Sequence, residues 1–200
     1  MNHISRRDMV RVLAAATGAV AFDWTPGEAA RAAVYARRTG AANQGYEPAF
    51  FTPHEWQVVN ILVDIIIPRD ERSGSATDAS VPEFMDFIMM DGDNEQRQTA
   101  MRGGLAWLDT ECRERYDKNF VDCTESERSA VLDDLAWPAR ARPELGHGVR
   151  FFSSFRDLTA SGFWTSRMGM EDLAYLGNTA VPEWAGCPEE QLDRLGVSYE

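Results

Sequence analysis

Apolar residues recur after residue 50 with the period of an α-helix, and this periodicity is the feature that most constrains the fold. Two stripes show intervals of three and four residues: Trp56, Val59, Leu62, Val63 and Ile66, and then Met101, Leu105, Leu108 and Cys112. No segment alternates apolar and polar residues over a useful length with the period of two that a half-buried β-strand requires. The sequence therefore predicts an all-α fold, a small irregular helical bundle with a loop-rich, aromatic C-terminal segment.

Capping signals and prolines place the ends of the helices. Thr52-Pro53-His54-Glu55 and Thr124-Glu125-Ser126-Glu127 are capping boxes, in which a threonine and a glutamate three residues later satisfy backbone N–H groups at a helix start. Gly103-Gly104 predicts a close crossing with another helix. The predicted helices cover about 53–67, 81–90, 95–116, 124–137 and 149–158, with a short helix near Met170 and a last helical turn over 188–196.

The N-terminus has the layout of a twin-arginine export signal. Ser5-Arg6-Arg7 precedes a modestly apolar, alanine-rich stretch from Val12 to Phe22, which is the order of charged and apolar residues in such signals. This stretch is too short to span a bilayer, which takes roughly 20 apolar residues. Ala30-Arg31-Ala32 and Val34-Tyr35-Ala36 both satisfy the small-x-Ala rule for cleavage, and the sequence does not choose between them. We expect an export signal and flexible tail over 1–45, followed by a single helical domain over 46–200.

Charge and ligand content argue against several classes of function. The chain has a net charge of −12, and an acidic body repels phosphate backbones, so nucleic-acid binding is not expected. The three cysteines form no CxxC pair and the three histidines lie far apart, so we expect no metal or iron–sulfur site from this chain alone.

In an oxidising compartment Cys112 and Cys123 are candidates for a disulfide. Cys187 is either a small buried residue or a link to another chain.

The last quarter of the chain, Phe151–Pro188, is dense in aromatic residues and glycines. Large aromatic side chains usually belong to a core, but a run of them without reactive side chains is also typical of a protein interface. The predicted partner interface consists of Phe163, Trp164, Tyr175, Asn178 and Trp184. Its backbone is expected to turn at Gly162, Gly169 and Gly177.

Several fragments together resemble the gluconate 2-dehydrogenase subunit 3 family. The C-terminal pattern is FF…R-x-L-T…GFWTS-x-x-G…DLAYLGN…W-x-G-C-P, and FFTPHEW at 50–56, DIIIPRD at 64–70 and VPEFMD at 81–86 fit the same family. The likeness covers Phe50–Val197. Members of this family are the small (gamma) subunits of bacterial FAD-dependent sugar and polyol dehydrogenases.

The resemblance implies a non-catalytic role in a complex. A separate large subunit of the glucose-methanol-choline (GMC) oxidoreductase class would carry FAD and the substrate pocket, and a cytochrome c subunit would commonly take the electrons. The large subunit of this family lacks a signal of its own, so the small subunit would bind it, stabilise it and take it to the periplasm, where the complex can associate with the inner membrane. Arg6 and Arg7 would be read by the twin-arginine export machinery.

The chain shows no cofactor motif of its own, which agrees with this role. It has no G-x-G-x-x-G fingerprint opening a strand-to-helix turn and no P-loop, H-E-x-x-H or G-x-S-x-G motif. A sugar oxidase would need a redox cofactor site. We therefore expect FAD in the partner subunit and no cofactor on this chain.

Two other functions stay open from the residues. An exported stand-alone enzyme, a hydrolase or lyase acting on an oxidised sugar, would use His147, Glu171 or Asp172 as acid and base groups. Glu171 and Asp172 are neighbours in sequence and point in different directions on a helix, so they do not form a converging pair. A secreted binding module unrelated to redox chemistry is the third hypothesis. His54 is expected to be a surface residue of a first helical turn without a ligand or base role.

Overall fold

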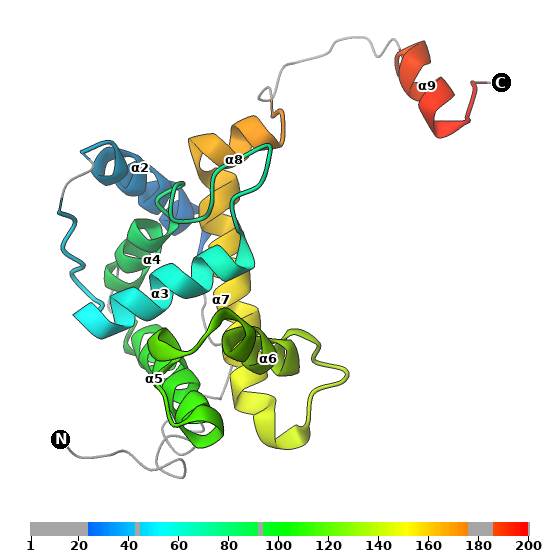
Figure 1. Ribbon diagram of the computed structural model, residues 1–200. Helices are drawn as coiled ribbons and strands as arrows, with labels where there is room; N and C mark the ends of the chain where they lie inside the picture. The colour runs from blue at the N-terminus through cyan, green and yellow to red at the C-terminus, as the bar shows by residue number, and fades with distance from the viewer. Residues whose placement is uncertain (1–23, 43–44, 92–93, 176–185, 200) are drawn as a thin grey trace.

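Every regular element in the described part of the chain is helical, which confirms the predicted fold class. The computed structural model describes residues 24–42, 45–91, 94–175 and 186–199. No helix in these ranges is both long and apolar enough to cross a membrane. The α-helices are α2 (Pro26–Ala42), α3 (Pro53–Ile66), α4 (Val81–Met90), α5 (Glu95–Tyr116), α6 (Glu125–Ala136), α7 (Gly146–Thr165), α8 (Arg167–Asp172) and α9 (Glu189–Leu195), with short 3-10 turns η1 (Phe120–Asp122) and η2 (Pro143–Leu145) (Figure 1).

Both predicted capping boxes form and fix the starts of α3 and α6. The Thr52 hydroxyl accepts a hydrogen bond from the N–H of Glu55 at 3.3 Å, and the Glu55 carboxylate accepts one from the N–H of Thr52 at 2.8 Å. Thr124 and Glu127 make the same reciprocal pair at 3.3 and 2.7 Å. Each box satisfies N–H groups that a helix start otherwise leaves without a partner.

α7 is the helix around which the others pack (Figure 1). It contacts α2, α3, α4, α5, α6 and α8. The sequence predicted a shorter helix, over 149–158, with a backbone turn at Gly162, and both expectations are wrong. Gly162 lies inside α7, where a Cβ would come within 3.0 Å of the Phe84 ring and 3.2 Å of Val81 in α4. This glycine allows a close approach of two helices and does not turn the chain.

The close helix crossing predicted at Gly103-Gly104 is confirmed, and it joins α5 to α7. A Cβ on Gly104 of α5 would overlap the ring of Phe151 in α7. Conversely, a Cβ on Gly148 of α7 would overlap the ring of Trp107 in α5. Each helix therefore offers a glycine to an aromatic ring of the other, and in a close-packed interior neither glycine has room for a side chain.

Residues 26–42 form a packed helix, not the flexible tail that the sequence predicted. α2 lies along α4 and also contacts α7. Alanine favours helices but carries little apolar surface, so its periodic spacing gives only a weak amphipathic signal in sequence. The folded core therefore begins with α2 rather than at residue 46. The buried residues of α2 are Ala29, Ala32, Ala33 and Ala36.

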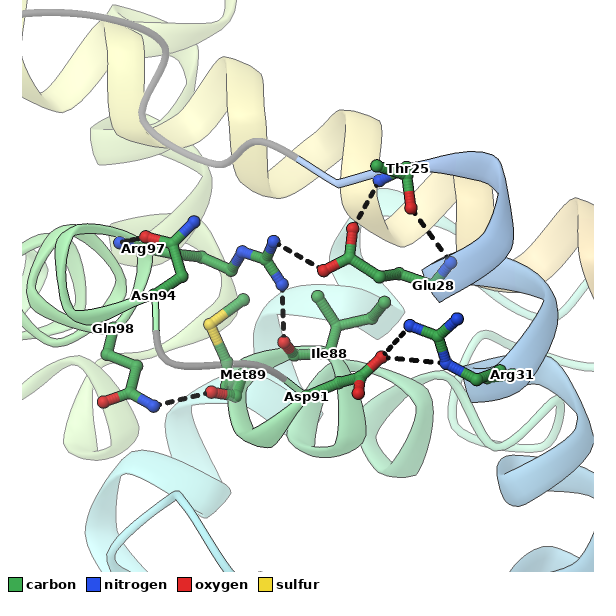
Figure 2. A network of polar contacts seen from close by, with 9 residues as sticks. All are labelled: Thr25, Glu28, Arg31, Ile88, Met89, Asp91, Asn94, Arg97 and Gln98. Atoms are coloured by element: carbon green, nitrogen blue, oxygen red, sulfur yellow. Dashed lines mark hydrogen bonds and ion pairs between the residues drawn. The ribbon is translucent and has the colours of Figure 1, made fainter.

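A polar network ties the start of α2 to α4 and α5 (Figure 2). Thr25 and Glu28 bond reciprocally: the Thr25 N–H donates to the Glu28 carboxylate at 2.6 Å, and the Glu28 N–H donates to the Thr25 hydroxyl at 3.2 Å. The second carboxylate oxygen of Glu28 accepts from the Arg97 guanidinium at 2.9 Å. Arg97 also donates to the carbonyl of Ile88 at 2.8 Å, so one buried cation connects three helices.

Asp86 of α4 holds the segment that leads into α3. Its carboxylate, 1% exposed, accepts from the backbone N–H groups of residues 49–51 at 2.8 to 3.2 Å and from the Tyr46 hydroxyl at 2.8 Å. Backbone N–H groups that leave water need such partners. The last residue of the VPEFMD motif therefore has a structural role.

Two further aspartates hold loops in the same way. Asp64 of α3, the first residue of DIIIPRD, accepts from the N–H and the hydroxyl of Thr77 at 2.8 and 2.7 Å. Asp109 of α5 accepts from the N–H of Phe120 at 2.9 Å. These bonds position the loop before α4 and the 3-10 turn before α6.

Candidate partner interface

The turn between α7 and α8 is held by Ser166. Its hydroxyl donates to the carbonyl of Phe163 at 2.6 Å and accepts from the N–H of Gly169 at 3.0 Å. Gly169, where the sequence predicted a backbone turn, lies inside α8 and directly against the end of α7, so a Cβ there would overlap the Phe163 carbonyl oxygen. Glycine shapes the backbone at this position through close approach rather than through a positive φ.

α8 is anchored to the loop that follows α3. Arg72 of that loop donates to the backbone carbonyl of Asp172 at 2.6 Å, and its guanidinium lies 3.1 Å from the Asp172 carboxylate. A Cβ on Gly74 would lie 3.0 Å from the methyl group of Met168, so loop and helix also meet at the start of α8 (Figure 1). Two segments 100 residues apart in sequence therefore fix the orientation of α8.

Three large apolar side chains are exposed at the ends of α8. Trp164, Leu173 and Tyr175 expose 39%, 58% and 53% of their surface, and α8 between them spans about 9 Å. Single exposed apolar residues are common on monomers, but several of them on an anchored turn are typical of a surface that another protein covers. We refer to these three residues as the α8 patch.

The structure separates the residues that the sequence assigned to the interface. Trp164 and Tyr175 are exposed, whereas Phe163 is 1% exposed and belongs to the core. The Phe163 ring packs edge to face on Trp164 with 4.9 Å between centroids, so Phe163 positions the exposed ring and does not reach the surface itself. Sequence reasoning missed Leu173. Asn178, Trp184 and Gly177, together with Arg6 and Arg7 of the export signal, lie outside the described residues.

A cleft of about 300 Å³ lies beside the turn, between α2, the start of α4 and α8. Two of its lining charges have oppositely charged partners: Asp78 lies 2.6 Å from Arg69, and Arg167 lies 2.7 Å from Glu171. Hydrogen bonds from the backbone of Ser75 lower the pKa of Asp78, which keeps this carboxylate ionised and paired. The cleft therefore combines both signs of charge and does not single out an anion or a cation as its ligand.

The residues named for the stand-alone enzyme do not converge. His147 lies in the first turn of α7, where its Nδ1 is 2.8 Å from Arg150; burial and the Arg150 charge lower its pKa. Glu171 and Asp172 lie beyond the other end of α7, about 27 Å away along a helix that rises 1.5 Å per residue. An acid and a base must both reach the same bound substrate. These three residues therefore cannot act together on one sugar ring.

One side-chain contact in the structure has no signal in the sequence. His54 Nε2 lies 2.6 Å from the carboxylate of Asp109, which is 6% exposed. His54 is an exposed residue of the first turn of α3, as the sequence predicted, and its ring also ties α3 to α5 through Asp109. The two residues meet only because α3 packs on α5, and no local spacing indicates that.

Cys112 and Cys123 lie against each other in the core as free thiols. Burial and the neighbouring Cys123 raise the pKa of Cys112. Cys187 is exposed. In the ranges that the structure covers, no group of three or more histidine, cysteine or carboxylate side chains is arranged to hold a metal ion.

Comparison with known proteins gives one family match. A model of the family described as Gluconate 2-dehydrogenase subunit 3 matches residues 53–182. The match begins at the first residue of α3 and runs through α8, so it includes the α8 patch and leaves α2 and α9 outside. No curated protein and no solved structure matches the chain.

Proposed function

Because the chain belongs to the gluconate 2-dehydrogenase subunit 3 family, and is thus a subunit of a dehydrogenase complex, we propose that it binds, stabilises and co-exports an FAD-dependent, GMC-class sugar dehydrogenase. The catalytic chemistry would belong to the large subunit, which would hold FAD and the sugar. This chain would contribute a binding surface and an export signal, without catalytic residues or a cofactor of its own.

The α8 patch is the observation that carries the proposal. Trp164 at the end of α7, and Leu173 and Tyr175 just after α8, present apolar surface at the two ends of this short helix. Ser166, Gly169 and the Arg72–Asp172 pair join the helix to its neighbours. A surface that is rigid before binding loses little conformational entropy when a partner covers it. Aromatic side chains held in this way are the residues that dominate binding energy at protein interfaces.

The N-terminal sequence supports the export part of the proposal. Arg6 and Arg7 precede an apolar stretch in the manner of a twin-arginine signal. The twin-arginine route carries folded cargo, so one signal on the small subunit would take a flavin-loaded partner across with it. The complex would then work in the periplasm, associated with the inner membrane where a cytochrome c subunit accepts its electrons.

Co-expression with the flavoprotein subunit tests the proposal. We would measure dehydrogenase activity in the periplasm and the flavin that co-purifies with this chain, for the wild type and for Trp164→Ala/Tyr175→Ala. The double variant should lower both by at least about tenfold, as expected for the loss of interface anchors. Trp137→Ala is the matched control, because Trp137 is 62% exposed but lies at the end of α6, away from α8 (Figure 1). A flavoprotein that is equally active and exported without this chain would refute the proposal.

A further inference from the structure

Two of the triplets that satisfy the small-x-Ala cleavage rule lie inside α2. Ala30-Arg31-Ala32 and Val34-Tyr35-Ala36 occupy its middle turns, and the two alanines at the cleavage positions, Ala32 and Ala36, are buried. A protease needs an accessible, locally unfolded chain, so cleavage within a packed helix requires that helix to open first.

Opening α2 would disrupt contacts along its whole length. Its alanine face packs on α4 and α7. The Tyr35 ring lies 4.9 Å from the Phe87 ring of α4, centroid to centroid. Near its C-terminal end, Gly40 is so close to Ser80 that a Cβ would overlap the serine hydroxyl. α2 is therefore part of the same core as Phe163 at the end of α7.

Charged contacts join the first half of α2 to α4 and α5. Cleavage after Ala32 would remove Glu28 and Arg31, whose partners are Arg97 and Asp91 (Figure 2). The Arg97 side chain is only 5% exposed, so it would keep its charge inside the protein without a carboxylate beside it. A buried charge that has lost its partner is strongly destabilising.

We propose that α2 is retained in the exported subunit, so that any cleavage of the leader lies on the N-terminal side of Trp24. Triplets of the same kind, Ala14-Ala15-Ala16 and Ala19-Val20-Ala21, precede α2 and meet the rule without cutting the folded domain. This inference rests on the export step of the proposed function. Trp24 itself packs against the core, which places the boundary before it.

The mass of the intact chain isolated from the periplasm tests this directly. We expect a chain that begins at residue 24 or earlier. Any start between Thr25 and Ala42 would overturn the inference. A variant with Ala30→Lys and Val34→Lys would block both triplets within α2, because the first position of such a triplet must be small; both residues are exposed, so the fold should survive. The inference requires the same N-terminus as in the wild type, and a shifted N-terminus would contradict it.

A second measurement separates this inference from the export proposal. Chains that begin at Asp23, Ala33 and Arg37 would be made without a leader in the cytoplasm and compared by thermal unfolding. The chain from Asp23 should melt within about 2 °C of the full chain, and the other two should melt more than about 10 °C lower or fail to fold. Equal melting temperatures would refute the role of α2 even if export succeeds. If the full chain never reaches the periplasm but the truncations behave as expected, the export proposal alone has failed.

Discussion

The carboxylate of Glu28 and the guanidinium of Arg97 lie 2.9 Å apart, although 69 residues separate them in the chain. Burial alone would raise the pKa of Glu28, but hydrogen bonds from the Thr25 backbone and from Arg97 outweigh it and lower the pKa to about 2. The pair thus connects the first turn of α2 to the bundle and makes the stability of the fold depend on pH.

Glu28→Gln should destabilise the fold at neutral pH but not at low pH. A carboxyl group whose pKa is lower in the folded chain stabilises the fold above its unfolded value of 4.5 and loses that contribution as the pH falls toward 2. We expect a loss of about 2 kcal/mol in the free energy of unfolding at pH 6, shrinking steadily below pH 4.5. Urea unfolding at pH 6 and pH 3 measures it, with the exposed Glu125→Gln as control. A difference that stays constant over this range would contradict the assignment.

Asp86→Asn should destabilise the protein by about 2 to 4 kcal/mol. The substitution places an NH₂ group where one of the carboxylate oxygens now accepts N–H and O–H donors of residues 46 and 49–51. Two donors that face each other leave buried groups without partners. Denaturant unfolding measures the loss, and hydrogen exchange of residues 49–51 should accelerate. Asp133→Asn on the exposed face of α6 should leave both unchanged. Normal protection at 49–51 in the Asp86 variant would show that the carboxylate does not hold this segment.

Gly169→Ala should weaken both the fold and the recovery of flavoprotein. The new Cβ would overlap the Phe163 backbone, which cannot move without shifting the end of α7, so we expect about 2 to 3 kcal/mol of destabilisation. Gly146→Ala is the matched control, because a Cβ there meets only the Arg150 guanidinium at 3.8 Å, an ordinary contact. Thermal unfolding and flavin co-purification are the two readouts. If both variants behaved alike, the packing of α8 on α7 would not matter for the partner.

Cysteine reactivity should divide the three thiols into two classes. In reduced protein Cys187 is exposed, whereas Cys112 and Cys123 are buried and burial raises the pKa of Cys112. The thiolate is the reactive form, so a thiol reagent at pH 8 should label Cys187 rapidly and the other two only after unfolding. Rapid labelling of all three would mean that the core opens readily.

The periplasmic chain should carry a disulfide between Cys112 and Cys123, since their side chains already touch and the compartment is oxidising. Alkylation after denaturation should then modify one cysteine in the periplasmic protein and three in the cytoplasmic protein. Closing this short loop is expected to stabilise the fold by about 2 to 3 kcal/mol. Three alkylated cysteines in both preparations would rule the bridge out.

Local signals predict where helices start, whereas the core faces of helices depend on packing. Thr52 and Thr124 mark helix starts because a capping box is complete within four residues. The start of α2 carries the same pattern, Thr25-Pro26-Gly27-Glu28, and its reciprocal bonds form, so this start was also predictable. The apolar residues of α2 give no such signal, since alanines become core only when α4 lies against them. Glycine at 162 is compatible with a turn and with a close helix contact alike, and only the position of Phe84 decides between the two.

The candidate interface was predictable in composition but not in orientation. Phe163 and Trp164 are adjacent in sequence, and on a helix adjacent side chains point about 100° apart, so one can lie in the core while the other faces water. Which one is exposed depends on α7 continuing past residue 158. The pairing of Arg72 with Asp172 and that of His54 with Asp109 join distant segments, and a single sequence contains no local signal for such contacts.

The three aspartates that hold the loops suggest how this scaffold can tolerate change. Each carboxylate accepts a hydrogen bond from at least one main-chain amide, and Asp86 accepts three, from residues 49–51. Main-chain amides are common to every residue type except proline. The residues of these loops can therefore be substituted while the loop backbone keeps its conformation, provided that the aspartate is retained. Glutamate is one methylene longer and would push the amides away. Diversifying these loops while leaving Asp64, Asp86 and Asp109 untouched would be a practical way to re-engineer the surface of this protein.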